Sequence, residues 1–113
     1  MTELLDEYIK KIERQKEKKR LEALRDITGA LNNLSKDFSF NEAYIFGSIL
    51  KKKRFYKDSD IDIAVSGLDD KDFFHFMARL YEILGRDVDV IQLENNRLKN
   101  KIVKEGLLWK KEG

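Results

Sequence analysis

Residues 44–65 are the stretch that most constrains the fold, because they join an apolar run to a second run in which carboxylates and apolar residues alternate. The first run ends in Gly47 and Ser48, and a segment rich in lysine and arginine follows it. In the second run, β-branched residues alternate with Asp60 and Asp62. Side chains two positions apart in a strand lie on the same face. The stretch therefore predicts two strands, the second with one apolar face and one face that begins acidic.

The order of the other periodic segments predicts an α/β fold in which helices pack against a small sheet. At 113 residues the chain is long enough for one core and too short to divide, so we predict a single domain over residues 1–113. Its expected parts are an N-terminal helical segment over 1–35, strands over 42–46, 60–65 and 87–93, helices over 69–84 and up to 104, and an edge element over 107–109.

The N-terminal helical segment carries an interrupted apolar stripe. The stripe lapses where Lys16 and Lys19 should continue it, and leucine and isoleucine then resume it. This pattern predicts either two helices or one long helix whose first turns project beyond the core. A projecting stripe needs a partner, either a second copy or another protein, whereas a segment that folds back on the domain needs none. The early stripe consists of Leu4, Leu5, Tyr8, Ile9 and Ile12.

The two later helices have predicted caps and buried faces. We expect Asp69 to cap the helix over 69–84, with Asp72 three residues on in a capping box. Its predicted buried stripe is Phe73, Phe74, Met77, Leu80, Tyr81 and Leu84. His75, the single histidine, lies off that stripe. In the last helix, which Asn95 or Asn96 can cap, the residues expected to face inward are Leu98, Ile102 and Val103.

Charge is distributed unevenly along the chain, although the net charge is only +2. Lysine and arginine outnumber acidic residues by 5 to 1 over residues 41–57 and by 6 to 2 over 95–113, whereas acids outnumber them by 10 to 3 over 58–94. An acidic centre between basic segments suits metal ions and phosphates that meet in one cleft. No apolar run approaches the roughly 20 residues that span a bilayer, and the N-terminus lacks a signal-peptide pattern. We therefore expect a soluble, cytoplasmic protein.

Asp60 and Asp62 have the chemistry and the spacing of metal ligands. Carboxylate oxygens are preferred ligands of Mg²⁺, and these two project from the same face of one strand. A third carboxylate from a neighbouring strand would complete the site, and either Asp89 or Asp87 can supply it. Two such ions can hold the attacking and leaving oxygens of a nucleotidyl transfer, in which catalysis is mainly in-line positioning and charge neutralisation.

Gly47 and Ser48 predict a contact with phosphate. Glycine at the end of a strand lets the backbone approach a phosphate closely, and serine at the start of a helix adds a hydroxyl beside free N–H groups. The basic residues that could meet the outer charge of a triphosphate are Lys51, Lys52, Lys53 and Arg54. These segments follow one another in the order that a single nucleotide-binding cleft needs.

These residues resemble the minimal nucleotidyltransferases of the DNA polymerase beta superfamily. The resemblance lies in FGS, a spacer, SDIDIAV and a later VDVIQLE, and it continues to KIVKEGLLW, so that it covers residues 42–109. It implies a nucleotidyltransferase fold with a mixed sheet and a catalytic core over 42–109. It also implies a nucleotide held at Gly47 and Ser48. Asp60, Asp62 and Asp89 would be the catalytic residues and the ligands of two Mg²⁺ ions, and Asp89 would help to activate the acceptor hydroxyl.

Small proteins of this family are commonly the antitoxins of toxin–antitoxin pairs, beside a helical HEPN ribonuclease toxin. The resemblance therefore implies an enzyme that uses ATP and transfers AMP to a tyrosine of a HEPN toxin. The chain departs from the family pattern where eleven residues, rather than about ten, separate Ser48 from Asp60. It departs again where ILKK, residues 49–52, replaces a small turn with arginine and glycine. Both departures bear on the phosphate contacts and leave the three carboxylates intact.

Two other functions fit parts of the sequence. A binding module that neutralises a helical toxin by direct contact, with weak transferase activity, would explain the N-terminal stripe and the altered turn. A nucleic-acid binder would use KKKRFYK and the basic C-terminal segment. In that case the acidic strands would repel a phosphate backbone unless metal ions intervened.

Overall fold

The computed structural model describes residues 2–52, 55 and 59–111, so the predicted phosphate contacts of Lys53 and Arg54 lie outside the described residues. The elements follow the predicted order of helix, two strands, helix, strand, helix and edge strand. They are α1 (Thr2–Leu34), β1 (Glu42–Phe46), the 3-10 helix η1 (Gly47–Leu50), β2 (Ile61–Ser66), the 3-10 helix η2 (Asp70–Asp72), α2 (Phe73–Leu84), β3 (Val88–Gln92), α3 (Lys99–Glu105) and β4 (Leu107–Lys110).

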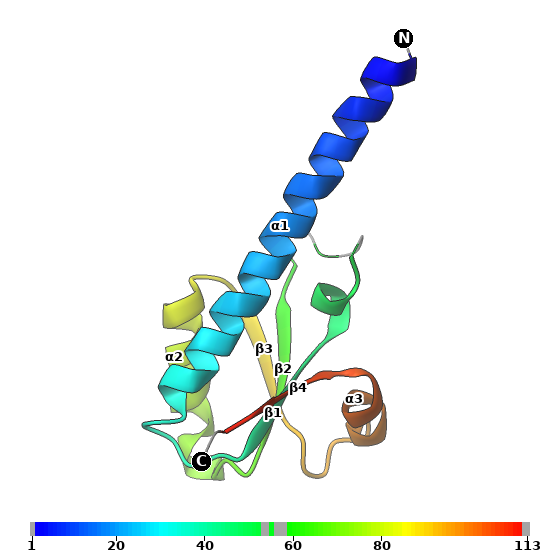
Figure 1. The fold of residues 1–113 in the computed structure, drawn as a ribbon. Coiled ribbons are helices and arrows are strands. Elements are labelled where there is room, and N and C mark those ends of the chain that lie inside the picture. Colours follow the sequence, from blue (N-terminus) through cyan, green and yellow to red (C-terminus); the bar gives the residue numbers. More distant parts are fainter. Residues whose placement is uncertain (1, 53–54, 56–58, 112–113) are drawn as a thin grey trace.

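The four strands form one mixed sheet in the order β3-β2-β1-β4. β1 pairs antiparallel with both β2 and β4, and β2 pairs parallel with β3. Helices α1 and α2 cover one face of this sheet, and the short α3 lies on the other (Figure 1). The predicted small mixed sheet with flanking helices is confirmed.

Apolar side chains pack on both faces of the sheet. The larger cluster joins Ile61, Ile63 and Val65 of β2 to the C-terminal half of α1 and to α2. The smaller cluster lies under α3 and contains Tyr44, Ala64, Leu93 and Ile102. Because Asp62 alternates with Ile61 and Ile63, its side chain lies on the face that carries α3. Strand β2 is thus held by packing on both of its faces, and this packing fixes the position of Asp62 at its beginning.

Helix α1 is one continuous helix of 33 residues, and its first turns project well beyond the sheet (Figure 1). Its buried residues begin only at Ala23, while Leu4 and Leu5 are 74% and 57% exposed. The structure thus agrees with the prediction of a single projecting helix and not with a segment that folds back on the domain. No helix in the described part of the chain is both long enough and apolar enough to cross a membrane.

The predicted buried face of α2 is partly wrong. Phe76, which was not assigned to the buried stripe, is 0% exposed and packs edge-on against Phe38 and Phe40, whereas Phe74 is 74% and Tyr81 55% exposed. Residues 70–72 form a 3-10 turn, and the residues that meet the core are Phe73, Phe76, Met77, Leu80 and Leu84. Phe74 and Tyr81 lie beside this stripe.

The predicted capping box is also wrong, because the chain enters α2 through that 3-10 turn. Within the described residues, neither Asp69 nor Asp72 caps a helix through its side chain. An α-helical capping box needs the residue three positions after the cap to lie in the first α-helical turn, and here Asp72 still precedes α2.

Two of the three residues expected to face inward from the last helix do not. Leu98 and Val103 are 45% and 44% exposed, and only Ile102 is buried. Helix α3 has seven residues, and Ile102 is the one that is buried. Asn96 does not cap the helix directly. It supports the preceding turn, where its Oδ1 accepts a hydrogen bond of 2.8 Å from the N–H of Leu98.

Candidate active site

The sheet brings two of the predicted metal ligands together. Asp62 on β2 lies directly opposite Asp89 on β3, and it also lies opposite Phe46 on β1. Adjacent strands are about 4.8 Å apart, and residues opposite each other project from the same face. Asp60 immediately precedes β2. The row of Phe46, Asp62 and Asp89 therefore forms the floor of the candidate site on the face that carries α3.

The register distinguishes between the two candidates for the third carboxylate. Asp89 is the residue opposite Asp62, whereas Asp87 precedes β3 and its carbonyl oxygen accepts a hydrogen bond of 3.2 Å from the N–H of Ile61. Asp87 lies at the edge of the sheet, in a groove that Asp60 and Asp89 also line. Asp89 is therefore the better candidate for a ligand beside Asp62.

The candidate carboxylates interact electrostatically. Asp62 is half-buried, and Asp60 and Asp89 are exposed. Partial burial, and then the negative charges of Asp89 and Asp60, raise the pKa of the Asp62 carboxyl above its ordinary value. Burial and like charges both disfavour the ionised form of a carboxylate. A cation held between these residues would relieve this repulsion.

Gly47 lies against the Asp62 carboxylate. Its φ of +86° is in the left-handed region, and a Cβ atom at this position would lie only 2.2 Å from Oδ2 of Asp62. Only glycine leaves room for the carboxylate while adopting this φ at little cost. The contact joins the turn that contains Gly47 and Ser48 to the acidic strand, two features that the sequence placed in one cleft.

The family resemblance implies metal ions at these carboxylates. In the described part of the chain, no three His, Cys, Asp or Glu side chains are grouped so that they could hold a metal ion. The donor set nevertheless fits a hard divalent cation, because its members are carboxylates on adjacent strands that repel one another. If the protein binds such an ion, Asp60, Asp62 and Asp89 are the residues that would hold it.

A pocket of about 530 Å³ lies beside Gly47, between η1 and α3. Phe46, Leu50 and Ile102 give it apolar walls. Its charged lining residues are Lys51, Lys101 and Glu105, so positive charge is in excess by one. Ser48 is half-buried, and its carbonyl oxygen accepts a hydrogen bond of 3.0 Å from the N–H of Lys51. The structure therefore places Gly47 and Lys51 in one pocket that adjoins the carboxylates.

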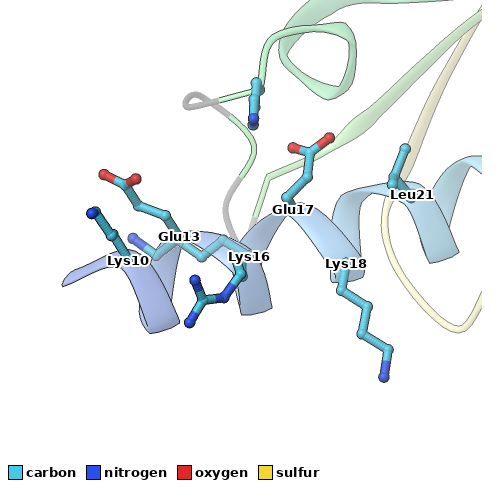
Figure 2. A pocket seen from close by; sticks show the side chains of 8 residues that line it. Lys10, Glu13, Lys16, Glu17, Lys18 and Leu21 are labelled. Atoms are coloured by element: carbon cyan, nitrogen blue, oxygen red, sulfur yellow. The ribbon is translucent and has the colours of Figure 1, made fainter. Parts of the chain in front are cut away.

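Lys52, by contrast, lies in a separate hollow of about 660 Å³ along the projecting part of α1. Charged side chains of the helix line most of this hollow, and Figure 2 shows Glu13 and Glu17 rising from one side of the helix while Lys18 points the other way. None of the predicted carboxylates or Gly47 lines it. We therefore assign no part of the candidate site to this hollow.

Two arginines, Arg20 and Arg86, donate hydrogen bonds to backbone carbonyl groups next to the site. Neither was predicted from the sequence. Arg20 on α1 donates a hydrogen bond of 2.8 Å to the carbonyl oxygen of Ile49 in η1, and Glu17 holds its guanidinium at 2.6 Å. Arg86 donates to the carbonyl oxygen of Ser59 and lies 4.7 Å from the ring centre of Phe55. The i,i+3 spacing of Glu17 and Arg20 could have predicted their ion pair, but not the contact of Arg20 with Ile49. The contact of Arg20 positions the segment that follows Gly47. The contact of Arg86 positions the segment that precedes Asp60.

The chain belongs to the family described as polymerase beta, nucleotidyltransferase, which it matches over residues 30–112. It is also similar to a solved structure of a toxin-antitoxin with AMP-PNP, with 26% sequence identity and a TM-score of 0.60 over 75% of this chain and 74% of that one. A structure assigned as a minimal nucleotidyltransferase is similar at 26% identity and a TM-score of 0.60, over 77% of this chain and 93% of that one. None of the curated proteins compared with the chain matches it.

Proposed function

We propose that this protein is a metal-dependent nucleotidyltransferase that transfers AMP from ATP to a hydroxyl acceptor. The observation that carries the proposal is the pairing of Asp62 with Asp89 beside Gly47, whose missing side chain makes room for the Asp62 carboxylate. Membership of the nucleotidyltransferase family supports it. The similarity to a toxin-antitoxin structure with AMP-PNP supports ATP as the nucleotide.

The proposed nucleotide position is the pocket between η1 and α3. Gly47 and Ser48 would contact the phosphates through the backbone of η1, while Lys51 and Lys101 oppose the negative charge of the triphosphate. Asp60, Asp62 and Asp89 would hold two Mg²⁺ ions, which when bound supply neutralisation of the charge on the phosphate oxygens. The apolar walls from Phe46 and Leu50 exclude water from one side of the nucleotide.

In the proposed reaction the acceptor hydroxyl oxygen forms a bond to the α-phosphorus of ATP. The bond from that phosphorus to the oxygen bridging to the β-phosphorus breaks, and pyrophosphate leaves. The hydroxyl proton passes to the carboxylate of Asp89, which is exposed and can meet an acceptor that approaches from solvent. The products are the AMP ester of the acceptor, pyrophosphate and a proton.

We further propose that the acceptor is a tyrosine of a cognate HEPN toxin, so that the protein acts as an antitoxin in the cytoplasm. The similarity to a toxin-antitoxin component supports a protein partner. To test the proposal, the protein is incubated with its copurifying partner and ATP labelled at either the α- or the γ-phosphate. Labelling of the partner from the α-position alone is expected. Labelling from the γ-position, or no labelling from either, would contradict AMP transfer.

A second candidate function is neutralisation of a helical toxin by direct contact, with weak catalysis. The observation that favours it is the exposed stripe on the projecting part of α1, where Leu4 is 74%, Tyr8 61% and Ile9 44% exposed. Single exposed apolar residues are ordinary, but a row of them on an isolated helix is typical of a contact surface.

Deletion of residues 2–14 is expected to leave the sheet folded and to weaken binding of the partner. The buried residues of α1 begin at Ala23, and Arg20 keeps its contact with Ile49 in the truncated chain. Circular dichroism would check the fold, and copurification with the partner would check the complex. If the truncated protein still neutralises the toxin and an Asp60→Asn/Asp62→Asn variant does not, the contact function is excluded.

A further inference from the structure

A groove of about 680 Å³ opens along the outer edge of the sheet, between β3 and α2. Its side chains include four acids, Asp60, Glu82, Asp87 and Asp89, and two aromatic residues, Phe74 and Tyr81. Two of these acids, Asp60 and Asp89, also belong to the candidate active site. The groove therefore leads from the flank of α2 to the carboxylates at which transfer is proposed.

The groove and the pocket beside Gly47 differ in charge. No lysine, arginine or histidine is among the described residues that line the groove, whereas two lysines, Lys51 and Lys101, and one acid, Glu105, line the pocket. A triphosphate would be repelled from the groove and attracted to the pocket. Asp62 lies between them in the sheet, because β2 separates β3 from β1. The groove is thus the side of the site that remains for the acceptor.

Two features of the groove suit a peptide. Phe74 and Tyr81, at 74% and 55% exposure, offer aromatic surface on the side of α2 that faces away from the core. Among the described residues β3 is an outer strand with a neighbouring strand on one side, and its other edge presents backbone donors and acceptors. Exposed strand edges bind extended peptides through main-chain hydrogen bonds, and adjacent pockets select their side chains.

We propose that this groove is the docking surface of the acceptor, and that its occupant is an extended basic segment of a partner protein. Lysine or arginine side chains of the segment oppose Glu82 and Asp87, an apolar side chain packs on Phe74 and Tyr81, and the acceptor hydroxyl lies beside Asp89. The assignment of this groove to the acceptor rests on the proposed function, because it assumes that the protein transfers AMP. A nucleic-acid acceptor would bring its phosphates against Glu82 and Asp87, the two groove acids that the proposed function does not assign to metal ions, so the charge favours a protein.

The test measures binding of two short fluorescent peptides by anisotropy, without nucleotide. Both contain leucine and a central phenylalanine, which cannot accept AMP, and the flanking residues are lysine and arginine in one and glutamate in the other. The basic peptide is expected to bind at least about tenfold more tightly. Glu82→Arg is expected to weaken its binding about tenfold by reversing one charge, and Phe74→Ser about fivefold by removing apolar contact.

Matched controls change residues of the same kind outside the groove. Glu7→Arg reverses an exposed charge on the projecting part of α1, and Ile83→Ser removes an exposed apolar side chain from α2. Neither is expected to alter peptide binding. Equal binding of both peptides, an unchanged affinity in Glu82→Arg, or direct binding of a fluorescent single-stranded oligonucleotide that Phe74→Ser weakens would overturn the proposal.

A second measurement on the same protein separates this proposal from the proposed function. Binding of ATP with Mg²⁺ is followed on the same protein by calorimetry, without peptide. Peptide binding that follows the expected pattern while ATP fails to bind would support the docking surface and contradict the transferase. ATP binding without selective peptide binding would contradict the docking surface alone.

Discussion

Replacing Asp62 by Asn is expected to lower the rate of AMP transfer by about a thousandfold or more. Asp62 is the central carboxylate of the row, with Asp89 opposite on one side and Gly47 against its Oδ2. Charge stabilisation by bound metal ions contributes several kcal/mol to such a transition state, and each 1.4 kcal/mol is about a factor of ten in rate. The amide keeps the size of the side chain and removes its charge. Single-turnover transfer of AMP from ATP labelled at the α-phosphate measures the effect.

The same substitution is expected to leave the melting temperature unchanged or to raise it in the absence of metal. Burial and the charges of Asp89 and Asp60 act against ionisation of Asp62, so the neutral amide removes an unfavourable interaction from the folded state. Asp69→Asn, at an exposed position outside the site, is the matched control and should transfer AMP at the parent rate. Parent-like transfer by Asp62→Asn would show that the reaction does not depend on this carboxylate.

Replacing Gly47 by Ala is expected to lower AMP transfer about a hundredfold and to destabilise the fold. A residue with a Cβ atom at φ of +86° costs about 1–2 kcal/mol, and that atom would lie 2.2 Å from Oδ2 of Asp62. The carboxylate must therefore move, and a displacement of about 1 Å in an active site can cost about a hundredfold in rate. Thermal unfolding and the single-turnover assay measure the two effects separately.

Gly29→Ala is the control for this prediction. Gly29 lies within α1, and apart from its chain neighbours and the nearby backbone of the helix itself, no heavy atom lies within 4 Å of a Cβ placed there. Alanine at this position is expected to stabilise the protein by about 0.5–1 kcal/mol, because glycine is unfavourable inside a helix. Transfer should be unchanged. Full activity in Gly47→Ala would mean that the position of Asp62 beside the turn does not matter for the reaction.

The strands, and the i, i+2 spacing that gives Asp60 and Asp62 a common face, could be predicted because short-range patterns determine them. The alternation around Asp60 and Asp62 shows which side chains share a face, whatever the neighbouring strand is. That Asp89 rather than Asp87 lies opposite Asp62 depends on the register between β2 and β3, which no local pattern encodes. The close approach of the Asp62 carboxylate to Gly47 likewise depends on where β1 ends relative to β2.

The buried face of α2 was predicted in part. Phe73, Met77, Leu80 and Leu84 meet the core as expected, and Phe76 completes their i, i+3, i+4, i+7 spacing, whereas Phe74 and Tyr81 lie beside this stripe and are exposed. The role of Arg20 was missed because its partner is distant in the sequence. Its acceptor is the carbonyl oxygen of Ile49, 29 residues away in the chain, and no spacing rule connects the two.

The proposed division of the site into a nucleotide side and an acceptor side depends on which strand neighbours β2. The pocket with Lys51 lies toward β1, and the acidic groove lies toward β3. The two substrates would therefore approach Asp62 from opposite directions, which is the arrangement that in-line transfer needs.

We propose that the carboxylates beside Gly47 form a metal-dependent ATP site. Titration calorimetry with ATP and Mg²⁺ on the parent and on Asp60→Asn/Asp62→Asn measures this binding. We expect binding by the parent, no binding by the double variant, and loss of binding by the parent when Mg²⁺ is removed with a chelator. Equal binding by both proteins, or binding by the parent that does not change when Mg²⁺ is removed, would contradict it.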